Sequence, residues 1–273
     1  MSTAVQPVEP SARERSNWNV LSLLRFLLAL FIAIFHLSFY ANIGPVIYLI
    51  KLGPFEVVLS FLLISGYSIG HSVSRKSEGF LRRRLWRIYP IFLIGMVVTY
   101  LATPQPLTPS FAWIILINLL FLGQVLTKDS YLDAGWSLNV EVWLYCLAPW
   151  LVRQSFRVLE TLILLSFLFF CFYTCGRSLF HWPYFIGTSY GINLPALSYI
   201  WLVGFYLAVV ENKKRALGLL GFIFVVYLAL AVGIQLIHRI KYHETHLFLS
   251  MDVGDYIGKS LLFLIIYLVF GNY

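Results

Sequence analysis

Long apolar stretches, separated by short polar or basic ones, follow one another along the whole chain. A membrane-spanning helix needs about 20 mostly apolar residues. On that basis the pattern predicts helices at residues 20–40, 54–71, 88–103, 138–152, 158–175, 195–210, 216–237 and 258–273. The predicted fold class is therefore an all-α, polytopic transmembrane helix bundle of about eight spans.

A further apolar stretch, residues 111–126, is short for a full crossing, and the basic residues decide how it lies. If the N-terminus is cytoplasmic and this stretch dips in without crossing, the runs SRKSEGFLRRRLWR, VRQSFR and ENKKR all fall on the cytoplasmic side. Basic residues favour that side of a membrane. We therefore predict one re-entrant or interfacial helix. Non-spanning backbone at membrane depth must be packed in protein or line a cavity, so we expect a cavity beside it.

The composition excludes a single soluble domain, because 60% of the residues are hydrophobic and only 12% are charged. The net charge of +8 does not indicate a nucleic-acid partner, since the basic residues stand in short runs beside apolar segments. The expected partner surface is the lipid bilayer. Residues 1–19 are predicted to form a polar cytoplasmic tail, and residues 20–273 the membrane domain, with the first helix retained rather than cleaved as a signal peptide.

The first predicted helix contains two ionisable residues, Arg25 and His36, in the segment LLRFLLALFIAIFHL. They are eleven residues apart, which corresponds to three turns plus roughly 20°, so they share one face and lie roughly 16 Å apart along the axis. Ionisable side chains in a membrane helix are unfavourable and often functional. The alternative is an arginine that extends to the headgroups and a histidine that is hydrogen-bonded within the bundle.

Three later segments carry polar groups that also allow two interpretations. Ser65 and Gly66 in FLLISGYSIGHS permit either close helix packing or an opening for a ligand. Arg84 and Arg87 in RRRLWRIYP are either signals of topology or a pair of guanidinium groups at the opening of one cavity, where they would suit phosphates. Glu141 in GWSLNVEVWLY is either a carboxylate favoured at a helix start or a functional acid.

In this order, the segments resemble the acyltransferase 3 family of integral-membrane acyltransferases. The resemblance is carried by Arg25 and His36, by the Ser65–Gly66–Tyr67 segment, by RRLWRIYP and by WSLNVE, and it covers about the first 150 residues well. The chain has fewer predicted spans than members of that family usually have, so the closing helices of the family are expected to be missing. Glu56, near the start of the second helix, matches no position of the family pattern.

The resemblance implies transfer of an acyl group, typically acetyl, from cytoplasmic acyl-CoA to a hydroxyl of an extracytoplasmic glycan or lipid-linked saccharide. Acyl-CoA is then a co-substrate, and no bound cofactor is expected. Its phosphates are expected at a basic mouth formed by Arg84 and Arg87 with electrostatic support from Arg82 and Arg83, and Ser65 is expected near the coenzyme. The implied location is the cell membrane, as a multi-pass protein with a cytoplasmic N-terminus.

The resemblance also implies roles in catalysis. His36 is expected to act as general base or to carry the acyl group covalently. Arg25 is expected to steer the coenzyme or to stabilise developing negative charge. Trp136 and Glu141 are expected on the outer side, lining the acceptor entrance, with orientation of His36 as an alternative for Glu141. Tyr67 is a further candidate for contact with the acceptor.

Two other chemistries are less well supported by the sequence. The segment HRIKYHETH has three histidines, but their spacing matches no established zinc motif, and Cys146, Cys171 and Cys175 stand in apolar stretches, so no metal site is expected. A polysaccharide or lipid transporter or flippase would also place charges in a helix bundle, but it predicts internal repeats that the chain does not show. A non-catalytic membrane scaffold would not explain why Arg25 and His36 lie on one face of a membrane helix.

Overall fold

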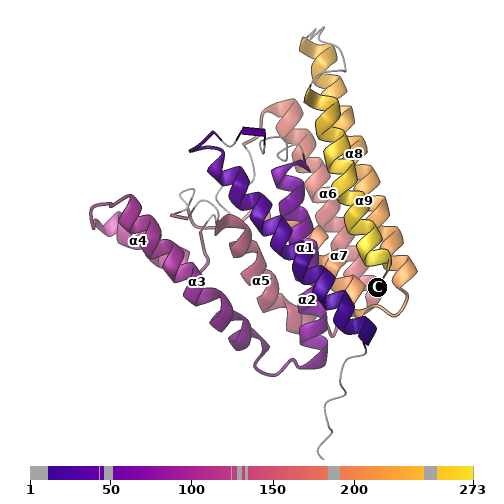
Figure 1. Cartoon of the computed structure of the whole chain (residues 1–273), viewed down its shortest axis with the longest axis horizontal. Helices are drawn as coiled ribbons and strands as arrows, with labels where there is room; N and C mark the ends of the chain where they lie inside the picture. Colours follow the sequence, from indigo (N-terminus) through magenta and orange to yellow (C-terminus); the bar gives the residue numbers. More distant parts are fainter. Residues whose placement is uncertain are drawn as a thin grey trace, which may run out of the picture.

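The computed structural model describes residues 12–42, 44–45, 52–123, 125–127, 131–132, 135–183, 191–242 and 251–272. All regular structure in these ranges is helical, and most of the long helices lie side by side in one bundle (Figure 1). The helices are α1 (Ala12–Leu37), α2 (Pro54–Arg75), α3 (Phe80–Ala102), α4 (Pro109–Leu119), α5 (Trp136–Leu151), α6 (Phe156–Phe180), α7 (Asn193–Val209), α8 (Lys213–Tyr242) and α9 (Met251–Gly271).

The predicted all-α membrane fold is confirmed, with each predicted span present as a helix. By length and composition, five helices of the described chain can cross a bilayer: α1, α2, α3, α6 and α8. The start of α3 was wrong in the prediction, because the helix begins at Phe80 and includes the arginines of RRRLWR. Arginine is a good helix former, and Gly79, in the left-handed region at φ 61°, ends the preceding turn.

The short helix α4 has 11 residues and is about 16 Å long, roughly half the thickness of the hydrocarbon core. The turn after it is held by neighbouring helices: the Tyr89 hydroxyl donates to the Leu119 carbonyl at 2.7 Å, and Trp143 Nε1 donates to the Phe121 carbonyl at 2.9 Å. Phe121 itself has φ 54°. The structure thus contains the short apolar helix that the basic residues predict, packed beside α3 (Figure 1).

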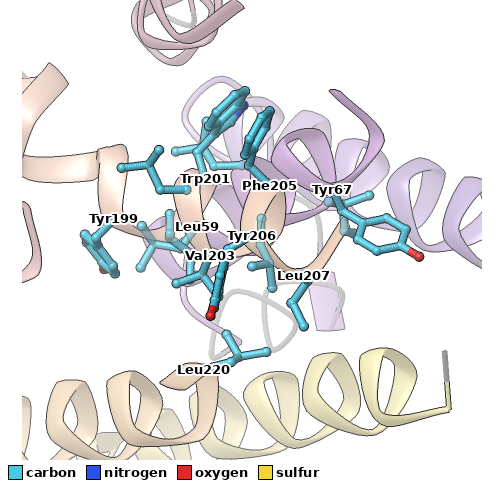
Figure 2. Packing of buried hydrophobic residues seen from close by; sticks show 14 of the residues in the cluster. Leu59, Tyr67, Tyr199, Trp201, Val203, Phe205, Tyr206, Leu207 and Leu220 are labelled. Carbon is cyan, nitrogen blue, oxygen red and sulfur yellow. The ribbon is translucent and has the colours of Figure 1, made fainter. Parts of the chain in front are cut away.

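The centre of the bundle is α7, which is buried on nearly every side, as expected for a helix that is hydrophobic all round. Figure 2 shows its side chains pointing in several directions, with Trp201 and Phe205 stacked together at 5.5 Å between ring centroids. It lies so close to α2 that a Cβ added to Gly66 would overlap the Trp201 carbonyl, and one added to Gly204 would overlap the Leu63 carbonyl. The packing interpretation of Gly66 is therefore confirmed.

Polar contacts tie the helices together at both ends of the bundle. At one end Glu160 of α6 accepts a 2.5 Å hydrogen bond from Tyr206 and forms a 2.6 Å ion pair with Arg215. At the other end Glu56, which is buried, accepts a 2.6 Å hydrogen bond from Tyr227 of α8. Lys259 of α9 pairs with the same carboxylate oxygen at 3.1 Å. Glu56, unmatched in the family pattern, thus connects α2 with α8 and α9.

The basic segments gather at one end of the bundle. The start of α1, the connection between α2 and α3, the connection between α7 and α8, and the end of α9 lie at the same end (Figure 1). This arrangement agrees with a chain that crosses back and forth between α1 and α9 with α4 left out of the alternation. The helices α1, α2 and α3 meet at this end, where the candidate site is formed.

Candidate functional site

A basic cavity of about 430 Å³ lies between α1, α2 and α3. Among the described residues, its walls contain six cationic side chains and no acidic one. Since no carboxylate neutralises the cavity from within, its chemistry is that of an anion site. The residues that line this basic cavity are Trp18, Arg25, Ser68, His71, Ser72, Arg75, Lys76, Arg83, Arg84 and Arg87.

Arg25 forms the inner wall of the basic cavity. Its Nη1 donates to Ser68 Oγ on α2 at 3.4 Å, and its guanidinium carbon lies 5.7 Å from the centre of the Phe61 ring. Ser68 in turn donates to the Ile64 carbonyl one turn earlier in α2. Arg25 therefore does not extend freely to the headgroups, because α2 holds its head inside the bundle.

The arginines at the start of α3 divide into three groups. Arg83 donates to the carbonyls of Glu78 and Lys76, at 2.5 and 2.8 Å, and so fixes the connection between α2 and α3. Arg84 is half-buried and interacts electrostatically with Arg25 and Arg87, which concentrates positive charge in the basic cavity. Arg82, expected to support the same site, is not among the residues that line the basic cavity and instead lines a separate groove of about 470 Å³ along α3.

An aromatic cluster borders the basic cavity on the side of α1 and α2. The Trp18 ring packs edge-on against His71 at 5.4 Å and lies 6.0 Å from the Tyr67 ring. His71 Nε2 and the Tyr67 hydroxyl are 3.2 Å apart. Lys213, at the start of α8, places its ammonium 6.0 Å from the Tyr67 ring centre. Tyr67 is buried, so in this structure it supports the cavity wall and does not line the cavity.

A buried hydrogen-bonded chain lies directly behind this wall. The Tyr145 hydroxyl donates to Glu141 Oε2 at 2.6 Å, and the same hydroxyl lies 3.1 Å from Ser65 Oγ. Glu141 Oε1 is buried, and no residue that the structure describes forms a hydrogen bond with it. The carboxylate interacts electrostatically with Arg25 and Arg84, both of which line the basic cavity. Glu141 thus lies beside the arginines rather than at an outer acceptor entrance.

His36 and Trp136 are not part of the basic cavity. His36 is half-buried in the last turn of α1, with Phe35 and Phe39 as ring neighbours at 5.6 and 6.2 Å. Trp136 begins α5 and packs against the hydrophobic core. The structure therefore brings Arg25, Arg83, Arg84 and Arg87 together around the basic cavity. Ser65 and Glu141 lie behind the cavity wall, and His36 lies about 16 Å further along α1.

The sequence analysis did not predict several residues of the site, although helical periodicity places them on the same helix faces as one another or as predicted site residues. Ser68, Ser72 and Arg75 follow one another at intervals of four and three residues on the face of α2 that lines the cavity. Trp18 precedes Arg25 by seven residues and so shares its face of α1. Tyr145 stands one turn after Glu141, the spacing at which side chains meet on a helix.

Residues 18–272 match the acyltransferase domain family, which is nearly the whole chain. This chain belongs to the acyltransferase 3 family. It is therefore a membrane acyltransferase, and the polar groups of α1, α2, α3 and α5 described above are the candidate active site of an acyltransferase. Comparison with curated proteins and with solved structures gives no match.

Within this acyltransferase, among the side chains that the structure describes, no group of three or more His, Cys, Asp or Glu residues is placed to hold a metal ion. The three histidines of the segment HRIKYHETH lie outside the described side chains. The chemistry available at the candidate site is that of guanidinium groups, a buried carboxylate, hydroxyls and imidazoles.

Proposed function

We propose that this acyltransferase transfers an acyl group, typically acetyl, from acyl-CoA held in the basic cavity to a hydroxyl of an extracytoplasmic glycan or glycolipid. The observation that supports the proposal is the basic cavity itself, in which six cationic side chains converge, five from α1, α2 and α3 and Lys76 from the connection after α2, with no acid among the described residues that line it. The coenzyme is the acyl donor whose several phosphates require such a site.

The phosphates are bound at the start of α3. Arg84 and Arg87 line the cavity one turn apart, and guanidinium groups match phosphate oxygens in a bidentate geometry. Arg83 donates to the Lys76 and Glu78 carbonyls. Its guanidinium therefore adds positive charge and fixes the connection between α2 and α3, but it is not free to bind a phosphate in a bidentate geometry. Cations at this end are on the cytoplasmic side if the basic segments orient the chain.

The part of acyl-CoA that carries the thioester is a slender arm. In this proposal the arm passes Arg25 and follows α1 toward His36. Arg25 is held by Ser68 at the inner wall of the cavity, and His36 lies on the same face of α1 about 16 Å beyond it. His36 is half-buried beside aromatic rings, and in this proposal it is the residue at which the arm meets the acceptor. The arm, and not the charged head, crosses the membrane interior.

The transfer itself needs one base and no redox partner. The acceptor hydroxyl oxygen attacks the thioester carbonyl, the carbon–sulfur bond breaks, and the hydroxyl proton ends on the sulfur of the released coenzyme A. His36 takes the proton as general base and returns it to the thiolate, or it carries the acyl group covalently between the two substrates.

Glu141 serves as a positioning residue in this scheme. Its carboxylate interacts with Arg25 and Arg84, and Tyr145 fixes one of its oxygens by a 2.6 Å hydrogen bond. A carboxylate near two guanidinium groups reduces their mutual repulsion. Trp136, at the start of α5, is the remaining candidate for contact with the acceptor, because Tyr67 is buried beside the basic cavity.

The test is transfer of label from radiolabelled acetyl-CoA into cell-envelope glycans by membranes that contain this chain, with release of coenzyme A measured in parallel. The Arg84→Ala/Arg87→Ala variant is expected to lose both signals. Arg82→Ala is the matched control, because Arg82 belongs to the same basic run but lines a different groove. Loss of transfer in Arg82→Ala to the same extent, or full transfer in the double variant, would contradict the proposal.

A further inference from the structure

An indole, that of Trp18 on α1, lines the basic cavity beside the six cationic side chains. The cationic groups account for the binding of phosphates, but they do not explain a tryptophan in the same wall. The Trp18 side chain is half-buried and packs against the edge of the hydrophobic core. A large, rigid aromatic ring at the wall of an anion site suits a ligand that has a flat apolar part as well as negative charge.

The neighbours of Trp18 hold its ring by edge and tilted contacts. The His71 ring is 5.4 Å away at an angle of 76°, and the Tyr67 ring is 6.0 Å away at 43°. Tyr67 packs edge-on in turn against Phe270 of α9 at 5.2 Å, so this aromatic cluster is anchored in the bundle. In the part of the chain that the structure describes, no ring is stacked face to face on Trp18. The indole is therefore held in place without a stacked aromatic partner.

The position of Trp18 along α1 gives the cavity a definite order. Trp18 precedes Arg25 by seven residues, about 10 Å along the axis and on nearly the same face, and it is nearer the end of the bundle where α1 begins (Figure 1). Arg84 interacts electrostatically with both Arg25 and Arg87, so the arginines of α3 face this stretch of α1. Inward from the end of the bundle, the cavity thus presents an aromatic ring first and the innermost guanidinium last.

Coenzyme A has the same order of chemical groups. Its adenine ring stands at one end, its phosphates come next, and the arm that carries the thioester follows. A purine is flat and has two π-faces, and bases stack favourably on aromatic side chains whatever their sequence context. With the arm directed toward His36 and the phosphates at the arginines, the adenine ring lies at the end of the cavity where Trp18 is.

We propose that the adenine ring of acyl-CoA stacks on the indole of Trp18, which makes Trp18 a residue that determines donor specificity. This inference rests on the proposed function, because it takes acyl-CoA as the occupant of the basic cavity. An acyl group on phosphopantetheine alone, as in a carrier protein, offers a phosphate to the arginines but no base to the indole. The stack therefore favours a coenzyme-bound acyl group over a carrier-bound one.

The first test is isothermal titration of the full-length purified protein with coenzyme A and, separately, with tripolyphosphate, which has the charge but no base. Trp18→Leu is expected to weaken coenzyme A binding about tenfold, within the range for loss of one stacked base, and to leave tripolyphosphate binding unchanged. Trp18→Phe keeps an aromatic face and should restore most of the affinity. Trp86→Leu is the matched control, because Trp86 stands between Arg84 and Arg87 in the sequence but lines a different groove.

The second test detects the stack itself, independently of affinity. Coenzyme A in which adenine is replaced by fluorescent ethenoadenine loses emission when its base stacks on an indole. At saturating protein, the bound probe is expected to be quenched by the unmodified protein and by Trp86→Leu. Trp18→Leu should leave most of the emission. Equal quenching by Trp18→Leu and Trp86→Leu would overturn the inference.

The outcomes separate this inference from the proposed function. If Trp18→Leu binds coenzyme A as tightly as the unmodified protein does, the stack is refuted and the donor site is not. If Trp18→Leu weakens coenzyme A and tripolyphosphate equally, Trp18 only shapes the wall, which also refutes the stack. If the unmodified protein does not bind coenzyme A, the proposed function fails, and the inference fails with it.

Discussion

Tyr145 donates a 2.6 Å hydrogen bond to the buried carboxylate of Glu141, one turn earlier in α5. The same carboxylate interacts electrostatically with Arg25 and Arg84, so this hydrogen bond fixes a charged group near two arginines of the basic cavity. Tyr145→Phe removes the hydroxyl and keeps the ring. We expect it to raise the KM for acyl-CoA by about tenfold, the effect of one hydrogen bond to a charged group.

The control for that variant is a measurement of thermal stability, because Tyr145 is also part of the hydrophobic core. Tyr145→Phe is expected to unfold within a few degrees of the unmodified protein while its KM rises. An unchanged KM, with or without a loss of stability, would show that Tyr145 does not position the site.

His36 is expected to affect turnover and not binding of the coenzyme. It lies outside the basic cavity, about 16 Å from Arg25 along α1. His36→Ala should therefore lower kcat by about 10²- to 10⁴-fold, the range for general acid–base catalysis. Binding of coenzyme A to the purified variant should stay unchanged. Arg84→Ala should show the opposite pattern, with weaker binding. A His36→Ala variant that transfers acyl groups normally would remove His36 from the mechanism.

The contact between α2 and α7 is expected to be sensitive to a single methyl group. A Cβ on Gly66 would overlap backbone atoms of Trp201, and backbone cannot move aside as a flexible side chain can. Gly66→Ala should destabilise the protein by about 1–3 kcal/mol. Gly218→Ala in α8 is the matched control, because nothing lies within 4 Å of the added Cβ. Thermal unfolding in detergent would compare them, and equal melting temperatures would refute the close packing.

The ion pair between Glu56 and Lys259 is expected to hold α9 against α2. Lys259→Met leaves a buried carboxylate without its charge partner, although Tyr227 still donates to it. Loss of one partner of a buried pair costs about 3–5 kcal/mol. The double variant Glu56→Gln/Lys259→Met should recover most of the stability. If the double variant is no more stable than Lys259→Met, the two charges do not act as a pair.

Much of the fold could be predicted from the sequence because the membrane imposes a simple length rule. Runs of apolar residues and the positions of basic residues located the spans and the short helix α4. The start of α3 was misplaced, because charge was taken to mark a loop, whereas arginines also favour helix. The ion pair of Glu56 with Lys259 joins residues about 200 positions apart, which no local pattern contains.

The candidate site was predictable only in part, for a geometric reason. Periodicity along one helix indicated that Arg25 and His36 share a face, and that Arg84 and Arg87 share a mouth. It does not specify the depth at which another helix meets that face. Glu141 therefore turned out to lie beside Arg25 and Arg84, and Trp18 and His71 emerged as wall residues only when α1 and α2 were placed together.

Binding of coenzyme A to the purified protein tests the basic cavity most directly, because it needs neither the acceptor nor turnover. Isothermal titration in low salt should give saturable binding to the unmodified protein and to Arg82→Ala, and binding should weaken as salt rises. Arg84→Ala/Arg87→Ala should show no measurable binding. If the double variant binds coenzyme A as tightly as Arg82→Ala does, the basic cavity is not the donor site.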